Sequence, residues 1–450
     1  MTTDVLLAMH ANRYGRAFPA ARHRHVHVSK RPFVVVGYHL PGDPSAPIGV
    51  MFGDNPDRPG FTYAVEPTRW RNKIDSMEGF ARSLNRYIAG AIQGNNGAPQ
   101  LLLANQAAVE WLCGDIGRYW RGLDADGQWG AGPSIPIAGA HLSYFAGANR
   151  VPGSSAVLPL ADVLTLHWAT GRLATLDRRL GVALAWIQRP DDIAAAEAEL
   201  SDGPVPDATW EQQEYLVSLR AYERHKGPDR QLAMKIIDGA VRSALEPTWC
   251  HAWQAHELLY GMSEAETVAE RWERDLARFR LHAERLRADQ ARFRSILPLL
   301  DAYNHIDRVE RMTAELHHAM AFDDDIIMAA HVARGAALSG IVTARNGRTL
   351  AIRPDLPFER AAGTRLWWRT RATIKNRERH VFVELRVRAG LTNDLVELDV
   401  VRGAATSATR NRLPAVGTHI VCPPFGGPKF IRRSMPDELP WTHLPAGVTP

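Results

Sequence analysis

The residues best suited to bind a metal ion are the histidines, which gather in three places along the chain. His23, His25 and His27 alternate in the sequence Arg-His-Arg-His-Val-His. On a strand such alternation puts three imidazoles on one face, where they could bind Zn²⁺ or Ni²⁺. The favoured interpretation is a basic N-terminal arm over residues 1–31, which hold six Lys and Arg against one acidic residue.

Two more groups of candidate ligands are Cys250, His251, His256 and Glu257, and then His317 and His318 followed by Asp323, Asp324 and Asp325. His251 and His256 are five residues apart on a predicted helix, so they do not share a face as i,i+4 ligands would. A helix end with a solvated acidic run explains the second group. We therefore predict no metal site and no cofactor.

Catalytic motifs are scarce. Asp355 followed by Glu384-Leu-Arg386 is similar in spacing to the restriction-like nuclease pattern, in which an acidic residue and Glu-x-Lys hold Mg²⁺. Arginine replaces the lysine and no helix lies between, which favours an edge carboxylate that balances nearby arginines. The chain has no G-x-x-x-x-G-K-[ST] and no Gly-x-Ser-x-Gly motif, and Gly426-Gly-Pro-Lys429 is interrupted by proline. A non-enzymatic role is favoured, and an enzyme with an unrecognised site in the N-terminal domain stays open.

Charge is unevenly distributed along the chain. Residues 334–433 hold 19 Lys and Arg against 7 Asp and Glu, whereas residues 32–333 hold 29 against 39. The formal net charge of +5 therefore hides a basic C-terminal module joined to an acidic body. Such asymmetry is expected of a protein that contacts a polyanion with one end.

Within this module, residues 364–374 and 380–388 alternate between two faces. Leu366 and Trp368 point one way and the arginines the other, so the arginine side is predicted to be the outer face. If the loop 375–379 joins these strands as a hairpin, that face combines arginines for phosphate with aromatic rings for bases, as single-stranded nucleic-acid sites do. The predicted nucleic-acid-binding residues are Arg365, Trp367, Arg369, Arg371, Lys375, Arg377, Arg379, Phe382, Arg386 and Arg388. An acidic protein partner, or an exposed hairpin with Trp367 covered by another domain, would give the same pattern.

The elements that carry these arginines have a period of two, which begins at residue 338. Predicted strands cover 338–343, 348–352, 364–374, 380–388, 395–402 and 418–422, and Asn346-Gly347 predicts a two-residue hairpin turn. About 90 residues of this pattern over 334–428 predict a small antiparallel β-barrel, OB-like or SH3-like. Residues 429–450 would form a tail.

Before this module the sequence predicts an α+β, multidomain chain. Short β-branched runs at 33–40, 48–52 and 61–65, a helix at 70–91, a strand at 100–104 and a helix at 106–123 indicate a mixed α/β domain over 32–190. The loop 124–133 and a long helical stretch at 157–187 would complete it. A linker or surface excursion at 188–206 would then lead to a helical region over 191–263.

Residues 264–333 predict a long helical arm. Apolar residues from Ala265 to Leu300 follow spacings of three and four, which is typical of a coiled-coil seam. Pro298 would end or kink the helix, and the seam resumes at Ile306. An antiparallel hairpin, a single kinked helix, or two ordinary helices packed on the middle domain all fit.

Composition favours a soluble cytoplasmic protein. Cys113, Cys250 and Cys422 are far apart, which argues against a disulfide framework, and no run of eighteen apolar residues occurs. Arginine outnumbers lysine 48 to 6, as expected of a GC-rich bacterium. A helical arm leading into a basic barrel is similar in outline to accessory barrels attached to helicases and nucleases. This likeness and the Arg/aromatic face predict an accessory protein that binds single-stranded nucleic acid and partners an ATPase, helicase or nuclease. An assembly factor that uses the arm and barrel to bind protein, with oligomerisation through the arm, is the alternative.

Overall fold

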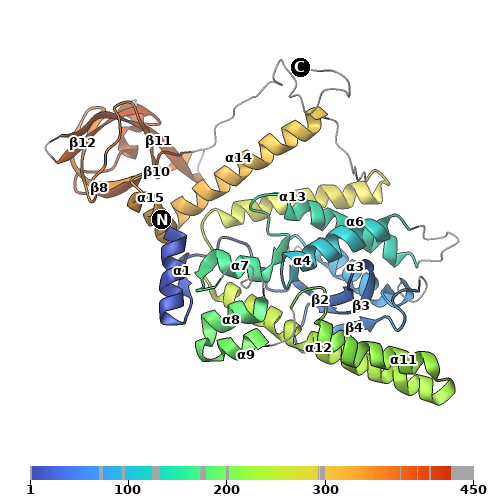
Figure 1. Cartoon of the computed structure of the whole chain (residues 1–450). Coiled ribbons are helices and arrows are strands. Elements are labelled where there is room, and N and C mark those ends of the chain that lie inside the picture. The colour runs from blue at the N-terminus through green and yellow to red at the C-terminus, as the bar shows by residue number, and fades with distance from the viewer. Residues whose placement is uncertain are drawn as a thin grey trace, which may run out of the picture. The chain divides into compact units, whose positions relative to one another are not determined.

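The computed structural model describes residues 3–69, 74–93, 97–123, 132–172, 179–198, 202–291, 293, 299–374, 377–392, 394–404 and 407–426 (Figure 1). The chain divides into two compact units. Residues 1–293 with 319–327 form the first unit, and residues 294–318 with 328–450 form the second. The mixed α/β class predicted from the sequence is confirmed.

A five-stranded sheet lies at the centre of the first unit, in the order β4-β3-β2-β5-β6. β2 (Phe33–Leu40) pairs antiparallel with β3 (Asp43–Gly53), which pairs in turn with β4 (Gly60–Tyr63). On its other side, β5 (Leu101–Leu103) and β6 (Val157–Pro159) run parallel to β2. The four strands predicted before residue 105 are all present.

Helices cover both faces of this sheet. The first face is covered by α3 (Glu78–Gln93), the continuous helix formed by α4 (Gln106–Val109), a π-helical segment (Glu110–Ile116) and α5 (Gly117–Arg121), then α6 (Ser134–Asn149) and α13 (Val268–Arg287). The second face is covered by α7 (Leu160–His167), α8 (Leu180–Gln188), α11 (Leu216–Arg224) and α12 (Gly227–Gly261).

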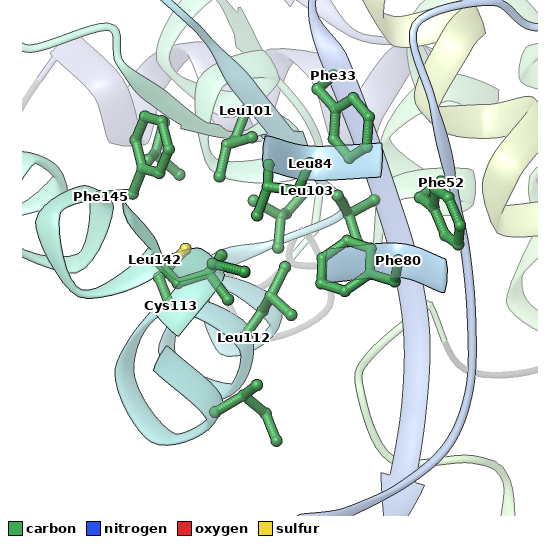
Figure 2. Close-up of a cluster of buried hydrophobic side chains, with 14 of the residues drawn as sticks. Phe33, Phe52, Phe80, Leu84, Leu101, Leu103, Leu112, Cys113, Leu142 and Phe145 are labelled. Carbon is green, nitrogen blue, oxygen red and sulfur yellow. The ribbon is translucent and has the colours of Figure 1, made fainter. Parts of the chain in front are cut away.

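Alternate residues of β2 and β5 enter the two opposite cores. Phe33 and Leu101 belong to the first core, which Figure 2 shows, and Val34 and Leu102 belong to the second. Because both faces of the sheet are buried, the first four residues of β2 and all three of β5 are apolar and do not alternate with polar residues.

One prediction for this unit is wrong. The predicted helix over 157–187 starts as the strand β6, since a short apolar run fits a buried parallel strand as well as a helix. Of the two alternatives for residues 188–206, the surface excursion fits: residues 188–192 are exposed, whereas Ala196 of α9 (Ile193–Ala198) is buried and the buried Asp202 accepts a hydrogen bond from the Gly181 amide. Polar composition alone did not distinguish the two.

The N-terminal segment also packs into the first unit. It contains α1 (Thr3–Tyr14), and β1 (Phe18–Pro19) pairs with β7 (Trp168–Ala169). Arg24 and His25 are buried, so residues 22–28 do not form a free basic arm.

The predicted coiled-coil arm is replaced by two helices with different surroundings. α13 ends at Arg287, and its Trp272, Leu276 and Phe279 pack into the first core. α14 (Leu299–Asp323) carries Ile306, which is 58% exposed although the seam predicted it buried. The apolar stripe of α13 therefore packs into the first core and does not form a coiled-coil seam. Pro298 lies outside the described residues.

In the second unit, α15 (Asp325–Ala333) precedes a nearly closed six-stranded antiparallel sheet in the order β10-β11-β12-β9-β8-β13. Its strands are β8 (Leu338–Asn346), β9 (Thr349–Pro354), β10 (Arg365–Ile374), β11 (Arg377–Thr392), β12 (Leu395–Arg402) and β13 (His419–Cys422). The Trp367 amide donates to the carbonyl of Pro423, just after β13, and brings the two ends of the sheet together. The predicted tail from residue 429 lies outside the described residues.

The first hairpin of this sheet turns one residue later than predicted. Asn346 pairs with Thr349, so Gly347 and Arg348 form the connection. Gly347 has φ of 57°, a conformation that glycine adopts without steric cost. None of the described helices combines the length and apolar composition needed to cross a bilayer.

Candidate nucleic-acid interface

The β10–β11 hairpin carries the predicted nucleic-acid-binding residues. Its register runs without a break from Arg365 opposite Arg386 to Ile374 opposite Arg377. β11 is therefore longer than predicted: Arg377 and Arg379 belong to it, although their side chains lie outside the described residues. Lys375 also lies outside them.

The two predicted faces of the hairpin are confirmed. Leu366, Val383 and Leu385 are fully buried in the core of the sheet, and Trp368 packs against that core. The arginines of β10 alternate with these residues and therefore lie on the outer face.

Trp367 lies on the outer face but is not accessible there. Only 9% of this residue is exposed, so the prediction of an exposed stacking ring is wrong. The chain after β13 covers it: a Cβ added to Gly426 would collide with the indole ring. A residue with a side chain at position 426 would not fit over the ring, which gives this glycine a structural role that the sequence did not reveal.

The covering segment is held by a histidine pair. Phe425 stacks on His318 of α14, with ring centroids 4.2 Å apart and planes 2° from parallel, and meets His331 of α15 edge-on at 5.0 Å. Burial, followed by repulsion from His317 and His331, lowers the pKa of His318, so its ring is neutral at pH 7. His318 therefore packs against an aromatic ring and does not act with the aspartates that follow it.

Arginines stand directly opposite one another on the outer face. Arg365 and Arg386 are cross-strand partners, both exposed, and Arg388 is exposed two residues further along β11. The Nε of Arg365 lies 3.5 Å from a carboxylate oxygen of Glu384, which is 5% exposed. On its other side Arg386 stands opposite Asp399 of β12, yet among the described residues no carboxylate lies within ion-pair distance of Arg386 or Arg388. Like charges placed opposite each other oppose strand pairing, and an anion bound between them would remove that cost.

The remaining predicted residues extend this face toward the tip of the hairpin. Arg369 is half-buried opposite the half-buried Phe382, and Arg371 is exposed opposite His380. Phe382 is therefore the aromatic residue of the predicted set that keeps some accessible surface.

The residues of the nuclease-like pattern have other partners. Asp355 accepts from the Ser339 hydroxyl at 2.5 Å and lies 2.7 Å from Nε2 of His419, contacts that lower its pKa, while Glu384 faces Arg365. This Ser/His/Asp cluster was missed in the sequence because its members are far apart. It does not form a catalytic triad, since the same Nε2 faces both Asp355 and Ser339, whereas a triad uses the two ring nitrogens separately.

The histidines considered as candidate metal ligands have separate partners. His25 lies 3.4 Å from Asp324 and His27 lies 3.2 Å from Glu264, while His256 contacts the carbonyl of Ser29. In the described ranges, no three His, Cys, Asp or Glu side chains are arranged to hold a metal ion.

The acidic run at the end of α14 is an anchor, which corrects the prediction that it is solvated. Asp324 is 1% exposed and accepts hydrogen bonds from the amides of Arg22 and His23, at 2.5 and 2.8 Å. Burial alone would raise its pKa, but the hydrogen bonds from His25 and these amides lower it well below the usual range. Asp323 accepts from the amide and hydroxyl of Thr267.

Comparison of this chain with family models, with curated proteins and with solved structures finds no match.

Proposed function

We propose that the second unit binds single-stranded nucleic acid through the outer face of the β10–β11 hairpin, in a non-enzymatic accessory protein that partners a helicase or nuclease. The observation that carries the proposal is the cluster of Arg365, Arg386 and Arg388, which are all exposed. Among the described residues, Arg365 lies 3.5 Å from Glu384, whereas Arg386 stands opposite Asp399 of β12 without an ion pair to it. Planar guanidinium groups suit bidentate contacts with phosphate.

Phosphate contacts would dominate this interaction, because Trp367 is covered. Phe382 is the candidate for stacking on a base beside Arg369. We assign the nearly closed sheet to the OB-like or SH3-like small barrels, a class that includes oligonucleotide-binding folds. Affinity would then depend steeply on salt and weakly on base sequence.

Fluorescence anisotropy with a labelled oligothymidylate and the full chain tests the proposal. The double variant Arg386→Ala/Arg388→Ala should weaken binding about tenfold or more and lower the slope of log affinity against log salt by about 1.4, at about 0.7 per phosphate contact on a single strand. The matched control is Arg82→Ala/Arg118→Ala in the first unit, where both arginines are exposed and each is paired with a carboxylate. Absence of binding by the unsubstituted protein at low salt, or equal affinities for the two double variants, would refute the proposal.

A further inference from the structure

The first unit contains a pocket of about 720 Å³ that the sequence did not indicate. It lies where β2 begins, where β3 ends and along α3, and its lining also includes Ala98, which precedes β5. Pockets of roughly 300–1,000 Å³ hold small organic ligands. Its volume therefore suits a small molecule or the terminal unit of a polymer.

Positive charge dominates the lining. Lys30, Arg31, Arg58 and Arg86 line the pocket with one carboxylate, Asp54. Asp54 is paired with Arg31 at 2.7 Å, and in the described part of the chain no carboxylate lies within ion-pair distance of the other three cations. A concave site lined by one sign of charge concentrates ions of the opposite sign.

Two arginines of α3 differ in their partners: Arg82, outside the pocket, is ion-paired, whereas Arg86, in its lining, is not ion-paired with any described residue. Arg82 lies one turn before Arg86 on the same helix, and its guanidinium lies 3.4 Å from Glu78. Arg82 does not line the pocket, whereas Arg86 does. The cations inside the pocket are thus left available for a ligand.

Hydrogen bonds fix the wall that carries Lys30 and Arg31. Gln100, fully buried, accepts from the Ser29 amide at 2.8 Å and donates to the carbonyls of His27 and Ser155 at 2.8 and 2.7 Å. The Tyr87 hydroxyl lies 3.1 and 3.2 Å from the carbonyls of Arg31 and Gln100, either of which can accept its hydrogen, and it accepts a hydrogen bond from the Gln100 amide. Both ends of segment 27–31 are held, so binding would require little ordering of the chain.

The rest of the lining combines aromatic and small residues with the polar His27, Ser29, Ser83 and Tyr87. Phe33 and Phe52 reach the pocket from the first core, with ring centroids 6.2 Å apart. Gly90 and Ala91 of α3 form another part, and open space lies beyond the position of a Cβ at Gly90. A ligand that fits has an anionic group for the cations and a ring-containing body for the remaining volume.

We propose that this pocket binds a phosphorylated nucleoside, with its phosphate against Lys30, Arg58 and Arg86. Phosphate is favoured because three cations without an ion-paired carboxylate among the described residues line one pocket, whereas a carboxylate ligand would need a single cationic partner. The same chemistry has two sources: a free nucleotide, or the phosphorylated end of a nucleic-acid strand. The site is separate from the hairpin face and does not depend on it.

Calorimetric titration of the full chain with adenosine monophosphate and with adenosine tests the role of charge. Adenosine should bind at least about tenfold more weakly, a change of about 1.4 kcal/mol. Arg86→Ala and Lys30→Ala should each weaken binding of the monophosphate by a similar factor, and the control Arg82→Ala should leave it unchanged. Absence of monophosphate binding at millimolar concentration, or equal affinities for all three variants, would overturn the proposal.

A second pair of variants tests the location without changing any charge. Gly90→Leu should fill the pocket and abolish binding, whereas Gly79→Leu, at another α3 glycine with open space around it and outside the pocket, should not. Retained binding by Gly90→Leu would overturn the proposed location.

In the Arg386→Ala/Arg388→Ala background, a 5′-phosphorylated oligonucleotide that binds more tightly than its unphosphorylated form would identify the strand end as the source. Equal binding of the two oligonucleotides, with the monophosphate still bound, would identify the free nucleotide.

Discussion

The two units present their available cations in different ways. In the first unit, Lys30, Arg58 and Arg86 surround a pocket whose wall is fixed by buried hydrogen bonds. In the second unit, Arg386 and Arg388 stand on the outside of a sheet and enclose nothing. An enclosed site selects a ligand by size and shape, whereas an open face selects by charge and by the number of contacts that a long ligand can make. The two proposals therefore differ in ligand: a small molecule for the cations of the pocket and a polymer for the arginines of the open face.

The largest expected effect is on the stability of the second unit and concerns Trp367, the buried ring of the open face. Trp367→Ala should lower the free energy of unfolding of the second unit by about 3–5 kcal/mol, because a buried indole is lost. Calorimetric melting measures this, with Trp367→Phe as the milder control. An unchanged melting temperature together with lost oligonucleotide binding would show instead that the ring is exposed and stacks on a base.

The next largest effect concerns the fixed wall of the pocket. Gln100→Leu leaves the Ser29 amide and the carbonyls of His27 and Ser155 without their partner. Of these contacts the one with Ser155 is fully buried, and a buried group left unsatisfied costs about 1–3 kcal/mol. We expect a loss of about 2–3 kcal/mol in the free energy of urea unfolding and weaker nucleotide binding. The exposed Gln290→Leu is the control. If Gln100→Leu keeps both stability and affinity, the wall does not depend on these bonds.

A smaller effect concerns pH and is built into the first unit. Burial lowers the pKa of His141 to about 3 and that of His282 to about 4, and their ring nitrogens lie 3.2 Å apart. When the pH is lowered from about 7 to 5.5, the unfolded chain takes up protons at these residues and the folded chain does not. The free energy of unfolding therefore decreases by about 1 kcal/mol for each histidine over this range.

Urea unfolding at several pH values checks this prediction. The double variant His141→Phe/His282→Gln should show a flatter profile than the unsubstituted protein, and the exposed His10→Gln should not. A profile that stays as steep in the double variant would place the responsible protons elsewhere.

The smallest effect concerns the cover over the open face. Phe425→Ala removes a stacked ring, worth about 0.5–1.5 kcal/mol, and uncovers His318. Because burial is the main cause of its lowered pKa, His318 should then titrate closer to its ordinary value. NMR titration measures this shift, with the more distant His305 as an internal reference. No shift at His318 would mean that Phe425 does not shield it.

Much of the second unit could be predicted because its signals are local. The period of two from Leu338 onward, and Gly347 between two apolar runs, depend only on neighbouring residues. The two faces of β10 followed from the same alternation.

What could not be predicted depends on distant contacts. The stripe on α13 suits a partner helix as well as a domain core, and only the position of Phe279 in the first core decides between them. The cover over Trp367 comes from a segment about 60 residues later in the chain. Lys30, Arg58 and Arg86 share no motif, because three separate elements bring them to one pocket.

The return of the chain to the first unit at residues 319–327 has a consequence for limited proteolysis. The backbone passes from one unit to the other three times. Segment 319–327, between the second and third crossings, is held in the first unit by hydrogen bonds from Thr267 to Asp323 and from the amides of Arg22 and His23 to Asp324. A single cut between residues 293 and 299 would therefore leave two fragments that stay associated under native conditions and separate only in denaturant. The chain of the second unit is thus interrupted by a segment of the first. A fragment that begins at residue 334 would lack α14, and with it His318, on which Phe425 stacks.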